Sequence, residues 1–453
     1  MTSLPGNDDS RSGSHRSSLS QTHSSQSLWL AQLNGGVWGI GNGLVSTTLI
    51  RYLSQDLGAD GLATGLIIAS PNLFGVFRAF APTMLWLAGS RKLMAIGMLL
   101  LSSLLLISLP LLAWPDVLPS KTFSLVVLIS LWGLWHFTMF LGVIALYSWV
   151  GDLSRGRGQS TFFGARQTWL VGGQVMGMFS AALIVGAISR SMPELTRWQQ
   201  HVLPAMLGGF MMLLSVLPLC WMKSIPLDSA KLSSTFQFFK PLFDPRYQSL
   251  VLFWCVAGIA NGAAASAVGL YPIVVAKLPA SRALSFEATM LLAQMIIAPL
   301  LGAWIDRRGS RVAMMVSQVF VSLALGFYLL ASKEQNFWIG GAYLFWIAYV
   351  GLNVGLYQAM VSLSPSGNNP LYISTFLALG GLCNGISSSV FGLIFDLLPR
   401  TAEPLLVIGS VGLDRFQLFI VVGIVCRLLT TGLLWRLPKD TGITIPAGET
   451  LGA

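Results

Sequence analysis

The sequence predicts an all-α polytopic membrane protein with about twelve transmembrane helices in two pseudo-symmetric six-helix bundles. Of its 453 residues, 54% are hydrophobic and only 10% are charged, whereas a soluble domain carries roughly 25% charged residues. Apolar segments recur along the chain, each of about 20 residues, which is the length that crosses a hydrocarbon layer of roughly 30 Å. Short motifs of the first half also recur in the second half. These three observations together determine the predicted fold class.

The first half begins with a polar segment. Residues 1–27 are rich in Ser, Gly, Gln and His, so we expect a disordered cytoplasmic tail, because such a composition buries too little apolar surface to fold. A cleaved signal peptide would instead place a basic region directly before a short apolar stretch. The first bundle is expected to comprise residues 28–222. Its helices are predicted at about 29–52, 62–87, 93–114, 123–150, 163–189 and 202–222.

The second half follows a polar interruption at residues 223–247, which we interpret as a central cytoplasmic loop. The second bundle is expected to comprise residues 248–437, and residues 438–453 form a second cytoplasmic tail. The helices of the second bundle are predicted at about 248–276, 284–305, 312–332, 337–363, 371–397 and 416–436.

Lys and Arg set the expected orientation. With the N-terminus in the cytoplasm, the inside loops carry more basic residues than the outside loops, which is the usual bias of membrane proteins. We therefore expect both termini in the cytoplasm and the protein in a bacterial inner (plasma) membrane. The net charge of +10 is spread over these short loops rather than gathered in runs, so it does not indicate a nucleic-acid partner.

Three motifs of the first half have counterparts in the second. Residues 39–43 read GIGNG and residues 258–262 read GIANG. An Ala-Pro pair at residues 81–82 matches another at residues 298–299, each before a basic loop. A pair of glycines also recurs, as Gly173 and Gly177 in the fifth predicted helix and Gly381 and Gly385 in the eleventh. The order and the similar offsets favour duplication, and two parallel repeats suit alternating access to a site between them.

One loop supports a family resemblance. Residues 302–311 read GAWIDRRGSR, which resembles the loop signature GxxxDRxGR of the major facilitator superfamily with one Ser inserted. The resemblance covers about residues 28–437 and implies a monomeric secondary transporter. The stretch WVGDL at residues 149–153, followed by RG and FGAR, is similar to a loop of uncharacterised bacterial members. The fifth predicted helix lacks the GPxxGG pattern of the drug/proton antiporter branch.

The resemblance implies a gate at the cytoplasmic helix ends. In that family the loop carboxylate and guanidinium hold helix ends together in one access state, and we carry this role to Asp306, Arg307 and Arg311. Such a pair can form when a cavity closes and separate when it opens. The alternative is that these charges only anchor the topology.

The corresponding loop of the first half has no Asp. It reads LAGSRK at residues 87–92, so Asp152 at the end of the fourth predicted helix is the candidate carboxylate. Its candidate partners are Arg91, Arg157 and Arg166. An equivalent ion pair in the first half is thus a separate prediction, which depends on how helices three, four and five meet.

Polar residues within the spans are candidate substrate ligands, because such groups are costly in hydrocarbon. The resemblance implies that helices 1, 4, 7 and 10 line the cavity. The candidates are Asn42, Arg78, His136, Tyr147, Asn261, Asn353 and Tyr357. Alternatively, the amides are contacts between helices, Arg78 pairs with carbonyl groups, and His136 is a neutral helix contact. Arg427 is expected to extend toward the cytoplasmic surface.

Few carboxylates lie at depth, so a carboxylate proton relay at the midplane is not visible. Coupling to protons or another ion would use His136 or Glu287, or would be absent. We expect a transporter of a small polar or anionic organic solute, with a membrane sensor or a flippase of lipid-linked substrates as alternatives. No GxSxG, HExxH or phosphate-binding loop motif occurs, so we expect neither an enzyme nor a cofactor or metal site.

Overall fold

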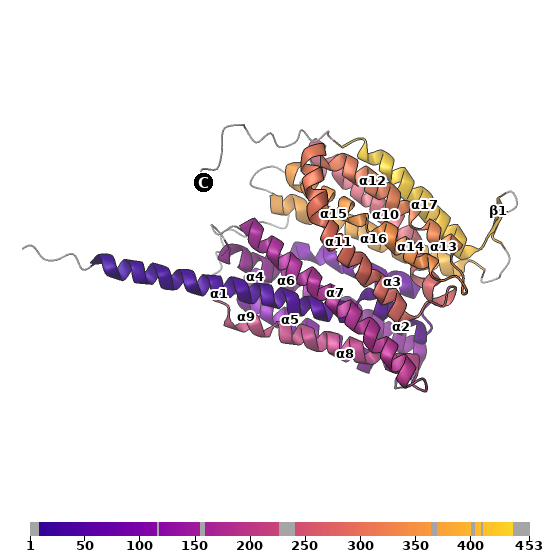
Figure 1. The fold of residues 1–453 in the computed structure, drawn as a ribbon, viewed down its shortest axis with the longest axis horizontal. Coiled ribbons are helices and arrows are strands. Elements are labelled where there is room, and N and C mark those ends of the chain that lie inside the picture. The colour runs from indigo at the N-terminus through magenta and orange to yellow at the C-terminus, as the bar shows by residue number, and fades with distance from the viewer. Residues whose placement is uncertain are drawn as a thin grey trace, which may run out of the picture.

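A computed structural model describes residues 9–115, 117–154, 159–225, 241–363, 369–399, 404–408 and 411–437. Its helices lie side by side along one axis (Figure 1). Within these residues, ten helical stretches are long and apolar enough to cross a membrane. A shorter apolar stretch, Gly61–Phe77, lies in the second predicted span. Together with the first predicted span, this places helical segments at all twelve predicted positions.

The first half contains the first nine α-helices and a 3₁₀ helix. These are α1 (Asp9–Leu44), α2 (Thr47–Asp56), α3 (Gly61–Leu73), η1 (Phe74–Phe80), α4 (Ala81–Ala88), α5 (Arg91–Leu112), α6 (Lys121–Leu153), α7 (Gln159–Ser191), α8 (Arg197–Ser215) and α9 (Leu217–Trp221).

The second half contains eight further helices and a small hairpin. These are α10 (Pro245–Val274), α11 (Ala280–Arg308), α12 (Ser310–Leu323), α13 (Gly326–Leu330), α14 (Trp338–Trp346), α15 (Tyr349–Leu363), α16 (Asn369–Leu397), β1 (Leu406–Ile408), β2 (Val411–Leu413) and α17 (Arg415–Leu434).

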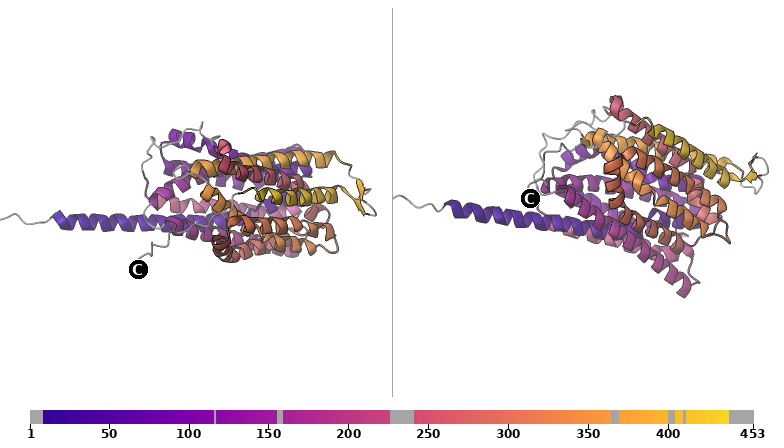
Figure 2. Two further views of the ribbon diagram at one scale, coloured as in Figure 1. Left: turned by 90° about the horizontal axis from the view of Figure 1, so that it is seen from above. Right: turned by 45° about the horizontal axis from the view of Figure 1, so that its top comes forward.

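The two ends of the bundle differ. Helix α1 begins and α17 ends at the same end, which we call the terminal end, and the opposite end carries β1 and β2 (Figures 1 and 2). We call the latter the hairpin end. The strands pair antiparallel, with Leu406 opposite Leu413. No strands are predicted here from the sequence, although short apolar runs with β-branched residues flank a Gly-Ser dipeptide.

The first span differs from its prediction in two ways. Helix α1 begins at Asp9 and projects from the bundle (Figure 2), where the sequence predicts a disordered tail. A helix already nucleated in the membrane extends at little cost through a segment without proline. The span also breaks after Leu44, and Ser46 starts α2 by accepting a hydrogen bond from the backbone of Leu49 (3.3 Å).

The second predicted span is divided into three pieces. Pro71 lies inside α3, and the chain continues as the 3₁₀ helix η1 before α4. Because proline removes one donor of the α-helical ladder, a tighter connection at this point is expected. Asp60 caps α3 through the backbone of Ala63 (2.9 Å).

The glycine motifs of the two halves have similar packing roles. A Cβ atom on Gly39 or Gly43 of α1 would collide with backbone atoms of α7. A Cβ atom on Gly258 or Gly262 of α10 would likewise collide with α16. Small residues at these positions therefore allow two helix backbones to approach closely. The predicted repeat is visible as equivalent contacts, α1 with α7 and α10 with α16.

Buried apolar side chains form three clusters that distinguish the two ends. The largest is near the hairpin end and includes residues of both halves, among them Leu53, Trp132, Tyr271 and Phe416. At the terminal end there are two clusters, one built from first-half residues and one from second-half residues. The apolar core is therefore continuous between the halves at the hairpin end and divided at the terminal end.

Candidate functional site

A cavity of about 350 Å³ lies between the two halves. The first half contributes α2 and α3 to its wall, and the second half contributes all its helices from α10 to α17 except α12 and α13. Its polar and aromatic lining residues are Thr47, Thr48, Arg51, Asn261, Glu287, Tyr343, Trp346, Tyr349, Asn384 and Arg427. We call this space the central cavity. A mostly pre-formed pocket with a few polar groups is the usual form of a small-molecule site.

One hydroxyl in the central cavity connects opposite charges from the two halves. Arg51 Nη2 donates to Thr48 Oγ1 (2.6 Å), and Thr48 Oγ1 donates to Glu287 Oε2 (2.7 Å). Thr48 and Arg51 belong to α2, whereas Glu287 belongs to α11. The three groups therefore form one hydrogen-bonded chain, in which the carboxylate is already engaged with a donor from the opposite half.

Arg427 lies on the same cavity wall and is only 6% exposed. Its Nε and Nη1 atoms are buried without a hydrogen-bond partner. Gln318 and Thr430 donate to its main-chain carbonyl (3.2 and 2.6 Å), not to its guanidinium. The prediction that this side chain extends toward the cytoplasmic surface is wrong, because α17 turns this face inward against α10 and α12.

Two further cavities lie within the bundle. One, of about 210 Å³, shares Asn261 and Asn384 with it. The other, of about 340 Å³, lies within the first half and is lined by Tyr147 and Arg166. Arg166 is 5% exposed and donates to Tyr147 Oη (2.9 Å) and to Asn34 Oδ1 (3.2 Å). Its guanidinium also lies 4.8 Å from the centre of the Tyr147 ring.

Two of the predicted substrate ligands lie at these cavities. Asn261 lines two of them, and Tyr147 lines the third. Asn353 and Tyr357 do not line these cavities. They are exposed on α15 and follow Tyr349 at intervals of four residues, so the three share one helix face.

The remaining substrate candidates lie elsewhere. Asn42 is half-buried on α1 and does not line any of these three cavities. The side chain of Arg78 lies outside the described residues. His136 is 6% exposed among aromatic rings, 4.7 Å from Trp132 and 4.4 Å from Trp135, measured between ring centroids. It does not line these cavities either.

The predicted carboxylate of the first half has a defined partner. Arg91 at the start of α5 forms an ion pair with Asp152 at the end of α6. Of the three candidate partners, Arg91 therefore makes this contact, whereas Arg166 binds Tyr147 and Asn34. Arg157 lies outside the described residues.

In the second half, Arg311 is the gating candidate whose surroundings are described. Its guanidinium lies 5.0 Å from the centre of the Trp435 ring and donates to the carbonyl of Leu437 (3.4 Å). Arg311 therefore connects the start of α12 with the end of α17. The side chains of Asp306 and Arg307 lie outside the described residues. A gating role for these residues stays a prediction.

At the hairpin end, hydrogen bonds join the halves. Tyr52 Oη donates to the carbonyl of Leu278 (2.6 Å), and the backbone N–H groups of Gly61 and Leu62 donate to Asp396 (2.7 and 2.6 Å). Ser266 Oγ donates to the carbonyl of Gly61 (2.8 Å). By contrast, the terminal-end contacts of Arg91, Arg166 and Arg311 each stay within one half.

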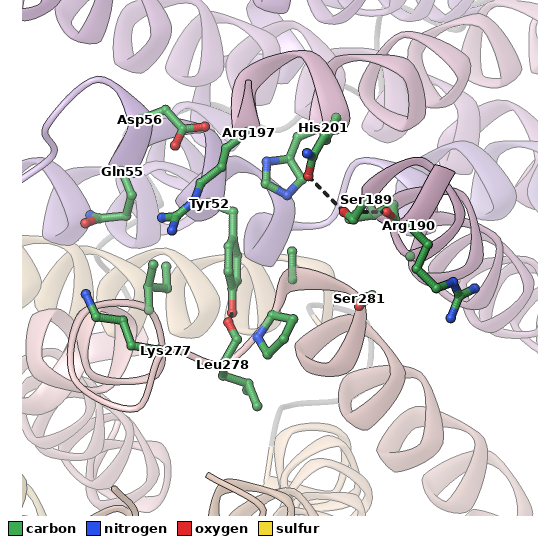
Figure 3. Close-up of a pocket in the computed structure, with 16 residues that line it drawn as sticks. Tyr52, Gln55, Asp56, Ser189, Arg190, Arg197, His201, Lys277, Leu278 and Ser281 are labelled. Atoms are coloured by element: carbon green, nitrogen blue, oxygen red, sulfur yellow. Dashed lines mark hydrogen bonds between the residues drawn. The ribbon is translucent and has the colours of Figure 1, made fainter. Parts of the chain in front are cut away.

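A hollow of about 400 Å³ lies around the Tyr52 contact, and Figure 3 shows the residues that line it. Tyr52 points from the first half toward Leu278. Ser189 donates to Gln200 (2.8 Å), and both line the hollow. Basic side chains of Arg190, Arg197 and Lys277 surround the hollow. Asp56 lines the hollow as well, so Tyr52 lies in a mostly basic depression at the hairpin end.

No family model matches the chain, and no curated protein does. Solved structures do match. A mutant of the nucleoside transporter NupG aligns with a TM-score of 0.66 and 13% identity, over 91% of this chain and 99% of its own. The inward-open xylose transporter XylE from E. coli aligns with a TM-score of 0.65 and 12% identity, over 92% and 97%. A POT family transporter in complex with 5-aminolevulinic acid gives 0.64 and 13%, over 90% and 95%.

The chain has the major facilitator fold. The likeness extends over nine-tenths of the chain, which agrees with the resemblance inferred from one loop and the internal repeat. At such low identity it shows the fold alone.

Several residues of the central cavity in this major facilitator fold are not among the predicted substrate ligands. Thr48 and Arg51 fall at the end of the first predicted span, whose break after Leu44 is not predicted. Glu287 was considered only for ion coupling. Two features of the sequence could have indicated the break. Ser46 is a residue type that starts helices, and Arg51 is a charged residue within the predicted span.

Proposed function

We propose that this chain is a secondary transporter that moves a small polar or anionic organic solute by alternating access. The observation that supports this most is the central cavity, which is built by both halves and contains charged groups that belong to predicted membrane spans. Charged residues within such spans mark substrate or ion pathways. A site between two repeats is where secondary transporters bind their cargo.

The distribution of contacts supports a state closed at one end. Hydrogen bonds and the shared apolar core join the halves at the hairpin end, while each half has its own core at the terminal end. The excess of basic residues predicts that the terminal end faces the cytoplasm. In this proposal the molecule is therefore closed toward the outside and its halves separate on the cytoplasmic side.

Glu287 is the better candidate for proton coupling than His136. Glu287 lines the central cavity and accepts a hydrogen bond from Thr48 of the opposite half (2.7 Å). His136 lies among aromatic rings away from that cavity. Protonation of Glu287 would remove the negative charge that holds α2 to α11 and so favour opening at the hairpin end.

Solute flux tests this proposal. The purified protein is reconstituted in liposomes, and pooled metabolites are screened for uptake with and without an imposed pH gradient. Uptake of at least one pool is expected, with the gradient dependence lost in the Glu287→Gln variant and retained in His136→Gln. Ligand-dependent stabilisation without any flux would instead favour a membrane sensor.

A reversible cross-link tests alternating access itself. A Cβ atom placed on Gly186 of α7 would lie 3.6 Å from Cβ of Ser281 of α11, within the usual range for a disulfide. The double variant Gly186→Cys/Ser281→Cys should lose flux when oxidised and regain it on reduction. Each single variant is the matched control and should keep its flux. Full flux through the oxidised double variant would contradict separation of the halves at the hairpin end.

A further inference from the structure

The charges that line the central cavity do not balance. Two guanidinium groups, Arg51 and Arg427, face one carboxylate, Glu287. Arg51 and Glu287 are linked through the Thr48 hydroxyl, so these two charges largely offset one another. One positive charge, that of Arg427, remains.

Of the three charged groups that line the central cavity, Arg427 has the fewest compensating contacts. Among the residues that the structure describes, no acidic side chain forms an ion pair with it, and two of its buried nitrogen atoms have no acceptor. An unpaired charge in a buried site is costly, and more so at membrane depth. An arginine kept in this position is therefore expected to have its partner in a molecule that enters the cavity.

We propose that the central cavity binds a monoanionic organic solute, a carboxylate, whose anionic group pairs with Arg427. This rests on the proposed transport function and specifies the substrate class of that site. A planar carboxylate matches the fork of a guanidinium and can accept two parallel hydrogen bonds. Tyr343, Trp346 and Tyr349 line the same cavity and provide the apolar wall for the body of the solute.

Helix α17 provides a matched control. Arg415 lies at the hairpin end of the same helix, where its guanidinium is 4.7 Å from the centre of the Phe395 ring and 5.2 Å from that of Phe416. Arg415 is thus stabilised by contacts inside the protein, whereas the partner of Arg427 is proposed to be the solute. The two substitutions Arg427→Gln and Arg415→Gln should therefore differ in their effect on the stability of the ligand-free protein.

The first measurement is the Tm of each purified full-length variant in detergent without added solute. Arg427→Gln should equal or exceed the wild-type Tm, because it removes an uncompensated charge, while Arg415→Gln should lower it. A residue placed for ligand binding often lowers stability in this way. A Tm of Arg427→Gln that falls as far as that of Arg415→Gln would show a structural role and overturn the proposal.

The second measurement uses matched pairs of solutes, benzoate with benzamide and lactate with lactamide. At least one carboxylate should raise the wild-type Tm with increasing concentration, its amide should not, and the rise should be lost in Arg427→Gln and partly retained in Arg427→Lys. Equal rises with the amides, or no rise with either carboxylate, would contradict a monoanion site.

Binding and transport fail separately in this design. Carboxylates that raise the Tm but cross no liposome would refute the proposed transport while leaving the anion site intact. Neutral solutes that cross, with carboxylates that neither bind nor cross, would refute the anion site while leaving transport intact.

Discussion

The hydrogen bond from Tyr52 to Leu278 tests how the hairpin end is held closed. The Tyr52→Phe variant removes only the hydroxyl that donates to the Leu278 carbonyl (2.6 Å), and both residues are buried. When the halves separate at this end, water can satisfy both groups. The substitution therefore destabilises the closed arrangement and leaves the open one almost unaffected.

The expected magnitude follows from the burial of the contact. A buried hydrogen bond contributes about 1 kcal/mol, and a carbonyl left without its donor costs about 1–3 kcal/mol. A change of about 1–2 kcal/mol alters an equilibrium roughly 5- to 30-fold. The population open at the hairpin end should rise by that factor.

Thiol accessibility measures this population. In a background without the four native cysteines, Val268→Cys places a thiol in the central cavity wall. An impermeant alkylating reagent is added from the hairpin side, and the labelling rate should rise roughly 5- to 30-fold in Tyr52→Phe. Tyr271→Phe is the matched control, because its hydroxyl donates to the Ala331 carbonyl (2.7 Å) within one half. Equal labelling rates in the two variants would refute the reasoning.

Two further substitutions test packing and the ion pair of the first half. Gly43→Ala should lower the Tm, because its Cβ atom would collide with the backbone at Gln174 and overpacking costs about 1–3 kcal/mol; Gly172→Ala, which meets no atom within 4 Å, should leave the Tm unchanged. A similar Tm for both alanine variants would contradict the close contact of α1 and α7. Asp152→Asn should also lower the Tm, by removing the partner of the mostly buried Arg91, and Arg91→Gln combined with it should recover part of the loss. A double variant less stable than Asp152→Asn would count against this pairing.

Composition and periodicity were sufficient to predict the class of fold. The low charge content and the repeated apolar segments indicate a bilayer as the solvent. The transfer of each segment into a bilayer depends on its own residues alone. The repeat was also visible, because the small residues at Gly39, Gly43, Gly258 and Gly262 are required wherever two backbones approach closely. The tail before the first span is helical from Asp9, a continuation that its polar composition did not indicate.

The candidate site was predictable only in part. Asn261 and Tyr147 were recognised as polar groups in spans, and both line cavities. His136 has the same character in the sequence but lies among aromatic rings. Polarity at depth shows that a residue needs a partner, whereas the helix face decides whether that partner is a cavity or a neighbouring side chain.

The sequence by itself determined that the chain crosses the membrane many times, that its halves repeat, and that few charges lie within the spans. Only the tertiary structure decided which charges meet. Arg51 and Glu287 are far apart in sequence and are connected through Thr48, while Arg427 faces the same cavity without a described ion-pair partner. The physical reason is that membrane insertion depends on the sum of local transfer free energies, whereas charge pairing depends on distances between helices that no local pattern specifies.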